Sequence, residues 1–399
     1  MAMKSEARMT RPFRRHVLYL PGFDPIPPRR YRELYRREGA EQARISGHRI
    51  KLSGARQGPN FGWTVDAEIE GRPVAATFEV LQWTDIVQAS MGRGILGTYG
   101  LMVRTFWIYM ASGAVPRLMR LRRGPVLAAF YPFAVLLAQL LAAVLAAWLV
   151  AWALPLGWFA LPPALAAFWG VLVLGRRLDG RLFAYYLMHD YAFTAVQKGA
   201  YPPALEDRLA AFRRRLSDLL DDDLDEVLVI GHSSGAYLAV SLLADLLRER
   251  PARARPALSL MTLGHVVPMA AFLPDADRLR DDLGYLSRAS GIFWLDVTAP
   301  GDACCFALCD PVAVCGMGDD RQKWPLVVSA AYTQTLSPER LARLRNRWFK
   351  LHFQYLCAFD RPGDYDYFAI TAGPLPLAER FAGRKPSPGL ITRPVGARP

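Results

Sequence analysis

Charged residues are missing from one long stretch of this 399-residue chain. Between Arg123 and Arg176 there is no Asp, Glu, Lys, Arg or His. About 20 apolar residues cross the core of a bilayer as a helix, so the stretch has room for two crossings. Pro155 and Gly157 interrupt it near the middle, which favours spans at about 126–153 and 157–174 joined by a very short turn. A buried soluble hairpin rarely lacks charge over such a length. We therefore predict a transmembrane helical hairpin over residues 123–176.

Lysine is also scarce, because only six of the 49 basic residues are lysine and the rest are arginine. A GC-rich genome that encodes arginine freely would explain this composition. The net charge of +13 would alternatively attract the chain to an anionic membrane surface. We expect no nucleic-acid partner, because the chain has no recognition module and no basic stripe interleaved with aromatic residues.

Arginines flank the uncharged stretch on both sides, at positions 117, 120, 122 and 123 before it and 176, 177 and 181 after it. Loops rich in Lys and Arg stay on the cytoplasmic side of a membrane. Both soluble parts are therefore expected on that side, and the hairpin leaves and returns. This predicts an integral protein of a bacterial inner membrane.

The cysteines form no recognisable metal-binding pattern. Four of the five lie between Cys304 and Cys315, spaced Cys-Cys-x3-Cys-x5-Cys, without the paired CxxC knuckles of a structural zinc site. Residues 1–15 are polar and basic with no apolar segment, so we expect no secretory signal and reduced thiols. P-loop, Rossmann and HExxH motifs are missing, which leaves phosphoryl transfer, NAD chemistry and zinc proteolysis without support. No metal or cofactor is expected.

The strongest motif is the run Val227–Gly235, which contains Gly231-His232-Ser233-Ser234-Gly235. Four apolar residues before the motif read as a buried strand, and an apolar helical run follows from 236 to 247. A serine on a sharp glycine-flanked turn between strand and helix is a nucleophile elbow. An ordinary glycine-rich turn is the alternative interpretation. With this context, the chain resembles the α/β-hydrolase superfamily of lipases and esterases over residues 15–60 and 182–382.

The resemblance implies an α/β fold whose mostly parallel sheet is flanked by helices, with the hairpin inserted. It also implies that an acid and then a histidine follow the nucleophile Ser233 along the chain. His265 and His352 are the histidines after Ser233. His265 precedes any plausible acid loop, so His352 is predicted as the base. The pattern around His352 looks helical, and a histidine on a helix face is the alternative.

Asp302 is the predicted acid, because it follows a strand in a Pro-Gly loop that can present its side chain at the sheet edge. Asp296 lies inside that strand, and Asp310 and Asp364 are further alternatives. The resemblance assigns the oxyanion-hole N–H groups to Phe23, after the first strand, and to Ser234. His232 is expected to shape the turn.

The chain is thus predicted to contain five parts. These are a disordered basic tail (1–15), the first part of the α/β domain (16–122) with an interfacial or lid segment at 95–119, the hairpin (123–176), the second part of the domain (177–383) and a disordered tail (384–399). Strands are expected at 16–20, 48–52, 62–70, 73–83, 227–230, 257–263, 291–297 and 326–333. One continuous helix is expected at 338–358.

The resemblance and the hairpin together predict a membrane-anchored serine hydrolase that cleaves carboxylic esters, with lipid or acyl esters favoured by the location. Its expected partners are membrane lipid and a small-molecule or lipid ester. An acyltransferase or thioesterase on the same triad, and a non-catalytic membrane scaffold, are the alternatives. The sequence leaves the oligomeric state open.

Overall fold

One mostly parallel sheet organises the protein. The computed structural model describes residues 11–56, 60–155, 157–250 and 256–395. Its strands lie in the order β2-β3-β4-β1-β5-β6-β7-β8. They are β1 (Phe13–Leu20), β2 (Arg49–Arg56), β3 (Gly62–Ile69), β4 (Arg72–Val80), β5 (Glu226–His232), β6 (Ala257–Leu263), β7 (Ile292–Thr298) and β8 (Leu326–Ser329). The six strands from β4 to β8 pair in parallel, and β2 and β3 join as antiparallel neighbours. The expected α/β class is confirmed.

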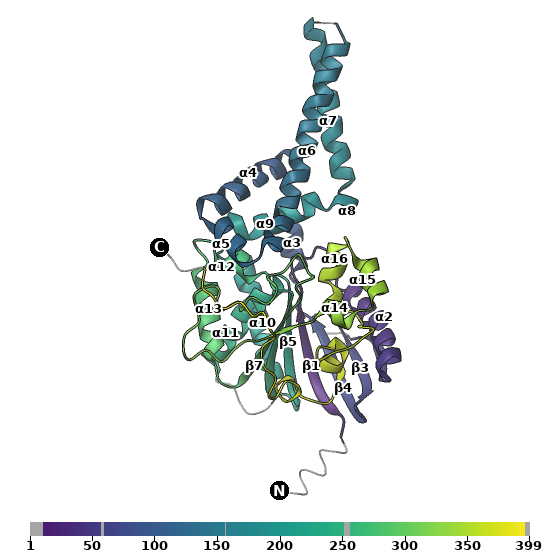
Figure 1. The fold of residues 1–399 in the computed structure, drawn as a ribbon, viewed down its shortest axis with the longest axis vertical. Helices are drawn as coiled ribbons and strands as arrows, with labels where there is room; N and C mark the ends of the chain where they lie inside the picture. The colour runs from purple at the N-terminus through teal and green to yellow at the C-terminus, as the bar shows by residue number, and fades with distance from the viewer. Residues whose placement is uncertain (1–10, 57–59, 156, 251–255, 396–399) are drawn as a thin grey trace.

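Helices cover both faces of the sheet (Figure 1). Alternate residues of β5 enter different cores, because side chains along a strand point to opposite faces. Val227 and Val229 pack with α10 (Pro203–Leu219), α11 (Gly235–Glu249) and α13 (Asp277–Arg288). Leu228 and Ile230 pack with α2 (Arg29–Ser46) and α17 (Tyr367–Ala372). Burial on both faces explains why this strand reads as a continuous apolar run.

The remaining helices lie mainly at the carboxyl ends of the strands. They are α3 (Thr84–Ser90), α4 (Ile95–Ala111), α5 (Ala114–Leu121), α6 (Arg123–Ala153), α7 (Leu161–Arg177), α8 (Asp179–Leu182), α9 (Ala184–Val196), α12 (Val267–Ala271), α14 (Tyr332–Thr335), α15 (Pro338–Leu344), α16 (Trp348–His352) and α18 (Leu377–Arg380), with 3-10 turns at Gly157–Ala160 and Gln354–Leu356. The segment expected at 95–119 is two helices, because the chain turns at Gly113 with φ of +65°.

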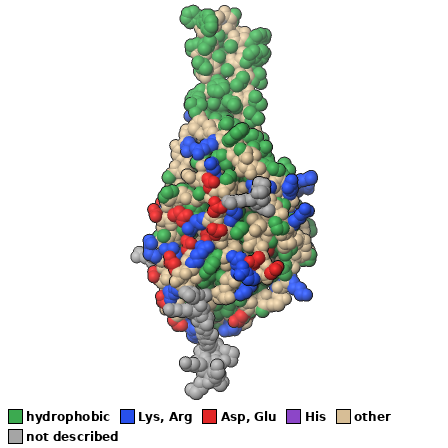
Figure 2. Space-filling view, turned by 90° about the vertical axis from the view of Figure 1, so that its left-hand side faces the viewer, with side chains coloured by type: hydrophobic (Ala, Val, Ile, Leu, Met, Phe, Trp, Pro, Cys, Tyr) green, Lys and Arg blue, Asp and Glu red, His purple; other side chains and the backbone are tan. Residues whose placement is uncertain are grey.

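Helices α6 and α7 form a hairpin that projects from the end of the body (Figure 1). By length and composition, α6 and the helical stretch Gly157–Arg177, which ends in α7, could each cross a membrane. Their large apolar side chains face outward, as Leu141, Trp152 and Trp158 are 61%, 75% and 88% exposed. On the face seen in Figure 2, the coloured side chains of this projection are hydrophobic, and Lys and Arg side chains begin at its base. Such exposure distinguishes the hairpin from the buried core helices of a soluble domain.

The parts of the chain before and after the hairpin share one sheet. Strand β1 pairs in parallel with β5, with Val17 opposite Leu228. The two parts therefore lie on the same side of anything that the hairpin crosses.

The structure differs from the expectations at both ends of the chain. Strand β1 begins at Phe13, not at His16, and Arg15 within it is buried with its Nε 2.6 Å from Glu226 Oε2. In the expected C-terminal tail, Ser387 donates its N–H to Val327 of β8, and Ile391 bridges to Cys309. These polar segments look disordered in sequence because their partners are distant in the chain. Residues 1–10 and 396–399 of the two expected tails lie outside the described residues.

The expected helix over 338–358 is interrupted twice. Helix α15 ends at Leu344, and Asn346 then adopts a φ of +64° before α16 begins. Helix α16 ends at His352, which places this histidine at the end of a short helix.

Candidate active site

Ser233 lies on a strained turn between β5 and α11. Its φ of +58° is in the left-handed region, which costs a non-glycine residue of order 1–3 kcal/mol. The Ser233 N–H donates to the carbonyl of Leu263 at the end of β6, at 2.9 Å. The motif glycines permit close packing here, because a Cβ on Gly235 would lie 2.2 Å from the Leu20 carbonyl oxygen. The surrounding backbone thus holds the serine in the elbow conformation.

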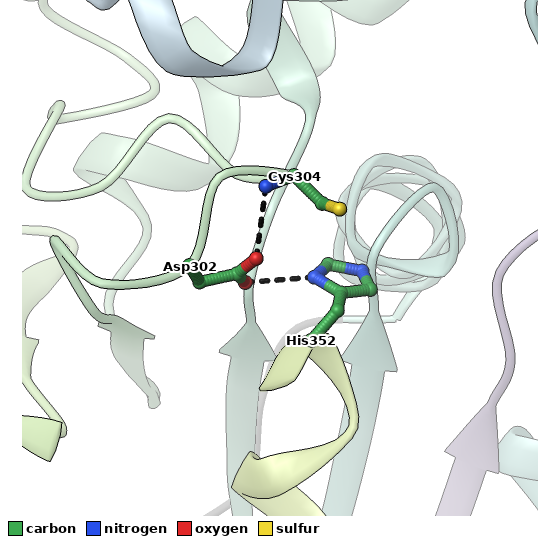
Figure 3. Close-up of side chains that lie close together, drawn as sticks. All are labelled: Asp302, Cys304 and His352. Atoms are coloured by element: carbon green, nitrogen blue, oxygen red, sulfur yellow. Dashed lines mark hydrogen bonds and ion pairs between the residues drawn. The ribbon is translucent and has the colours of Figure 1, made fainter. Parts of the chain in front are cut away.

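Asp302 and His352 are brought together from distant parts of the chain (Figure 3). Asp302 lies in the loop after β7 and His352 ends α16, and His352 Nδ1 is 2.7 Å from Asp302 Oδ2. Asp302 also accepts hydrogen bonds from the Cys304 N–H at 2.9 Å and the Tyr355 hydroxyl at 3.0 Å. Burial alone would raise the pKa of Asp302. The positive charge of His352 and these hydrogen bonds outweigh it and hold the pKa below its usual value.

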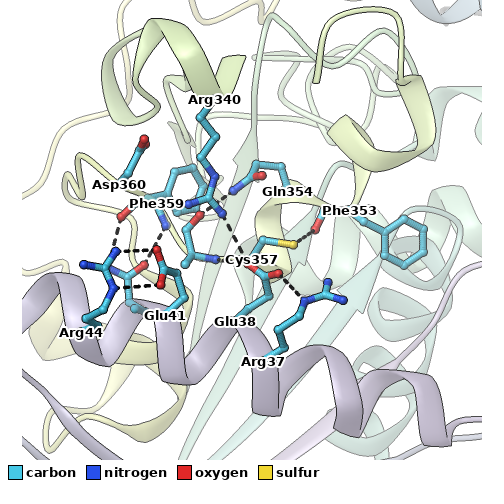
Figure 4. Close-up of polar contacts among 12 residues, drawn as sticks. Arg37, Glu38, Glu41, Arg44, Arg340, Phe353, Gln354, Cys357, Phe359 and Asp360 are labelled. Carbon is cyan, nitrogen blue, oxygen red and sulfur yellow. Dashed lines mark hydrogen bonds and ion pairs between the residues drawn. The ribbon is translucent and has the colours of Figure 1, made fainter. Parts of the chain in front are cut away.

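The segment after His352 is held to α2 by hydrogen bonds (Figure 4). The Ala358 N–H donates to Glu38 at 3.1 Å, and the Phe359 N–H donates to Gln42 at 2.8 Å. Arg340 also lies 3.4 Å from Glu38. These contacts hold the backbone on one side of His352 and so limit the movement of its ring.

Ser233 and His352 line one cavity at the carboxyl ends of the parallel strands. Pro125 of α6, and Tyr186 and Asp190 of α9, line it from the base of the hairpin. Among the described residues, no hydrogen bond joins the Ser233 hydroxyl to His352. Catalytic hydrogen bonds often form only when substrate is bound, so a shared cavity is compatible with proton transfer between the two side chains.

The loop after β1 lies against the elbow, as the resemblance implies. A Cβ on Gly22 would be 3.0 Å from the Ser233 Cβ. The Phe23 N–H donates to the Ser234 hydroxyl at 2.9 Å. Within the described part of the chain, the Ser234 N–H has no acceptor. One of the two expected oxyanion donors is therefore free, and the other is occupied by a side chain of the elbow.

His232 packs beside His352. Their rings stack with centroids 4.8 Å apart, and His232 Nε2 lies 3.1 Å from the His352 carbonyl oxygen. The Tyr19 hydroxyl lies 3.2 Å from His232 Nδ1. Burial, followed by the positive charge of His352, lowers the pKa of His232 to about 3. A neutral His232 can support the position of His352 without adding charge to the site.

The alternative site residues do not line this cavity in the described structure. His265 is fully buried, with its Nε2 3.0 Å from the Cys309 carbonyl oxygen. Asp296 accepts a hydrogen bond from the Thr262 hydroxyl at 2.6 Å, and burial raises its pKa well above the usual value. The other two candidates have structural contacts: Asp310 accepts N–H groups of its own turn, and Asp364 pairs with Arg384.

Two residues of α9 were missed by sequence reasoning. The Tyr186 hydroxyl donates to the Phe23 carbonyl at 2.5 Å. Asp190 faces the cavity, and burial raises its pKa to about 7 against the opposing charge of His352. An aromatic-rich helix directly after the hairpin was the available signal, and it identifies no particular residue.

Asp302, Cys304 and His352 form a group that could hold a metal ion, since one ligand atom of each lies within 4.8 Å of the others. Asp302 and His352 already share a hydrogen bond that a metal would replace. Burial, together with the charges of Asp302 and Asp190, raises the pKa of the Cys304 thiol well above its usual value. A protonated thiol is a poor ligand. All five cysteines are free of disulfides.

Comparison of the chain with protein-family models, curated proteins and solved structures gave no match. The cavity that Ser233 and His352 line, with Asp302 in contact with His352 behind it, is therefore the basis for assigning a function.

Proposed function

We propose that this protein is a serine hydrolase that cleaves carboxylic esters. The observation that carries the proposal is the 2.7 Å contact of Asp302 with His352, the histidine that lines one cavity with Ser233. Three further features support an α/β-hydrolase assignment. These are the parallel sheet, the strained serine between strand and helix, and the chain order serine, aspartate, histidine.

In the proposed mechanism, Ser233 Oγ attacks the ester carbonyl carbon while His352 Nε2 takes its proton. Asp302 accepts the Nδ1–H, which fixes the tautomer whose Nε2 is free to accept. The oxyanion is stabilised by the Ser234 N–H at the start of α11, where the helix dipole favours negative charge. The Phe23 N–H contributes once the oxyanion displaces the Ser234 hydroxyl. His352 then protonates the leaving alcohol, and water, activated by His352, hydrolyses the acyl-enzyme.

The proposal includes insertion of the hairpin into a membrane, with the body on the cytoplasmic side. The exposed apolar side chains of α6 and α7 support insertion, because they would otherwise contact water. Arginines at both flanks support the orientation. An esterase held at a membrane by this hairpin meets lipid and acyl esters before soluble ones, so these are the favoured substrates.

Labelling with a fluorophosphonate probe tests the proposal, because such probes react covalently with activated serines. Detergent-solubilised wild-type protein should label, and Ser233→Ala and His352→Ala should not. Ser290→Ala, at an exposed position, is the matched control and should label like the wild type. Loss of labelling in Ser233→Ala but not in His352→Ala would exclude His352 as the base.

Two outcomes would contradict hydrolysis of esters. No labelling of folded wild-type protein would favour a non-catalytic scaffold, in line with the lack of a hydrogen bond between Ser233 and His352. Labelling with preferred transfer to an added alcohol or amine over water would indicate an acyltransferase.

A further inference from the structure

Helix α9 contributes to the cavity at Ser233 a carboxylate that the proposed mechanism does not use. Tyr186, Asp190 and Thr194 recur every four residues, so they share one face of the helix, and all three line the cavity. The opposite face carries Met188, which packs with side chains of α4 and α6 at the base of the hairpin. This packing fixes the rotation of α9 and holds Asp190 at the cavity.

Among the described residues that line this cavity, Asp190 is the one charged side chain without a counter-ion. Arg30 also lines the cavity and lies 2.6 Å from Asp24. His352 is paired with Asp302 at 2.7 Å. The Asp190 carboxylate has neither a hydrogen bond nor an ion pair within the described part of the chain. An ionised carboxylate that is removed from bulk water is costly without a partner. A cation that belongs to a ligand would supply this partner.

The side chains around Asp190 favour one kind of cation. Tyr109, Tyr186, Tyr191 and Tyr237 line the cavity and lie close enough for the charge of Asp190 to act on their hydroxyls. The Tyr109 and Tyr186 hydroxyls donate to backbone carbonyls, so they do not partner the carboxylate. Aromatic rings attract organic cations through their negative faces, whereas metal cations such as Mg²⁺ and Ca²⁺ need several oxygen ligands. The lining therefore suits an organic ammonium group.

The protonation of Asp190 is compatible with such a ligand. Burial raises the pKa of Asp190 to about 7 against the opposing charge of His352. A nearby cation favours the ionised carboxylate and lowers this pKa again. At neutral pH the carboxylate and a bound ammonium group would thus stabilise each other. The cavity of about 90 Å³ restricts the bound part of the ligand to a small group.

We infer that Asp190 is a specificity-determining residue that binds an ammonium group of the substrate. The inference rests on the proposed function and narrows its substrate class to esters that carry an ammonium group a few bonds from the scissile carbonyl. The carbonyl carbon lies at Ser233, and the ammonium group contacts Asp190 within the same cavity. Asp302 and His352 keep their roles in the chemical steps.

The experiment compares kcat/KM for pairs of esters that differ only in charge, with full-length protein in a non-ionic detergent at neutral pH. Dimethylaminoethyl acetate carries a protonated amine in its alcohol part, and isopentyl acetate has a carbon in place of that nitrogen. Methyl dimethylaminopropanoate and methyl isocaproate form the corresponding pair with the charge in the acyl part. Asp190→Asn retains the size of the side chain and removes its charge. Asp207→Asn is the matched control, because Asp207 is an exposed residue of α10 that does not line the cavity.

Wild type and Asp207→Asn should prefer the charged ester of at least one pair. Asp190→Asn should lower that preference by about 10- to 100-fold, the range expected for a hydrogen bond to a charged group, with little change for the neutral ester. Absence of a preference in wild type, which needs no variant to fold, would overturn the ammonium site. An equal preference in Asp190→Asn would also overturn it. Absence of both ester hydrolysis and fluorophosphonate labelling in wild type would instead overturn the proposed function.

Discussion

Two aspartates provide a comparison, Asp296 within β7 and Asp302 in the loop that follows this strand. Asp302 contacts His352, whereas Asp296 contacts Thr262 and lies near His265. Replacement of each by asparagine retains size and removes the charge. We expect Asp302→Asn to abolish most reactivity of Ser233, and Asp296→Asn to preserve it.

The magnitude for Asp302→Asn follows from its three hydrogen bonds. If the asparagine carbonyl continues to accept from the Cys304 N–H, the amide NH2 group faces His352 Nδ1. The NH2 group can only donate, so His352 adopts the other tautomer and its Nε2 carries the proton. Nε2 then cannot accept a proton from Ser233. In the Ser-His-Asp triad of a serine protease the same change lowers kcat about 10⁴-fold, equivalent to ~5.5 kcal/mol.

The two aspartates should also differ in how their contributions to the stability of the fold depend on pH. Burial raises the folded-state pKa of Asp296, so its favourable contribution exists below the ordinary value of about 4 and is lost as pH rises toward the folded-state pKa. The loss amounts to about 1.4 kcal/mol per pH unit in that window. Asparagine carries no charge, and its carbonyl can accept from Thr262. The variant should therefore gain stability relative to wild type as pH rises from about 4.

The contribution of Asp302 to stability has the opposite dependence on pH, because its folded-state pKa is lowered. Its contribution is present above about pH 4 and disappears as pH falls through the folded-state pKa. Urea unfolding at neutral and acidic pH, combined with the rate constant of fluorophosphonate labelling, measures both effects. Equal labelling of Asp302→Asn and wild type, or a larger loss in Asp296→Asn, would refute the assignment of Asp302.

Three other substitutions test the surroundings of the site. Gly22→Ala should slow labelling at least ~10-fold, because its Cβ would push against the elbow, and an unchanged rate would show that the loop has room to move. Arg15→Met should lower the free energy of unfolding by about 3–5 kcal/mol by leaving Glu226 buried and unpaired, against less than ~1 kcal/mol for Arg14→Met at the exposed neighbouring position. Under the proposed orientation, Trp158→Cys at the tip of the hairpin should add a site that reacts with an impermeant maleimide from the periplasmic side, beyond any reaction of the five thiols of the wild type. A site added on the cytoplasmic side instead would reverse the orientation.

Local features of the fold could be predicted from the sequence. Strand β6 matches its predicted range, 257–263, because it is buried on both faces and bounded by turn residues. The strands expected at 62–70 and 73–83 correspond to β3 and β4, and the turn between them lies at Glu70 and Gly71, which adopt φ of +54° and +71°. The elbow at Ser233 was recognisable because a strand, a turn and a helix adjoin in the chain.

Long-range contacts could not be predicted in the same way. Arg15 looked like part of a tail because its charge gives no sign of Glu226, 211 residues away. The position of Asp190 depends on how α9 packs beneath the hairpin, and no local pattern encodes that packing. Chain order favoured Asp302 and His352, but the distance between them follows only from the positions of β7 and α16.

The connections of the hairpin determine how deeply the site lies below a membrane. Only Arg122 separates α5 from α6, so the hairpin joins the body without a flexible linker. Pro125, two residues after Arg123, lines the cavity with Ser233, and a helix rises about 1.5 Å per residue. The cavity wall therefore lies about 3 Å along the helix from the arginine flank, which in an inserted hairpin lies at the headgroups. Lipid ester carbonyls lie near that depth, between headgroup and acyl chain. Under the proposed function, this depth of the cavity wall at Pro125 favours entry of a lipid ester into the cavity that Ser233 lines.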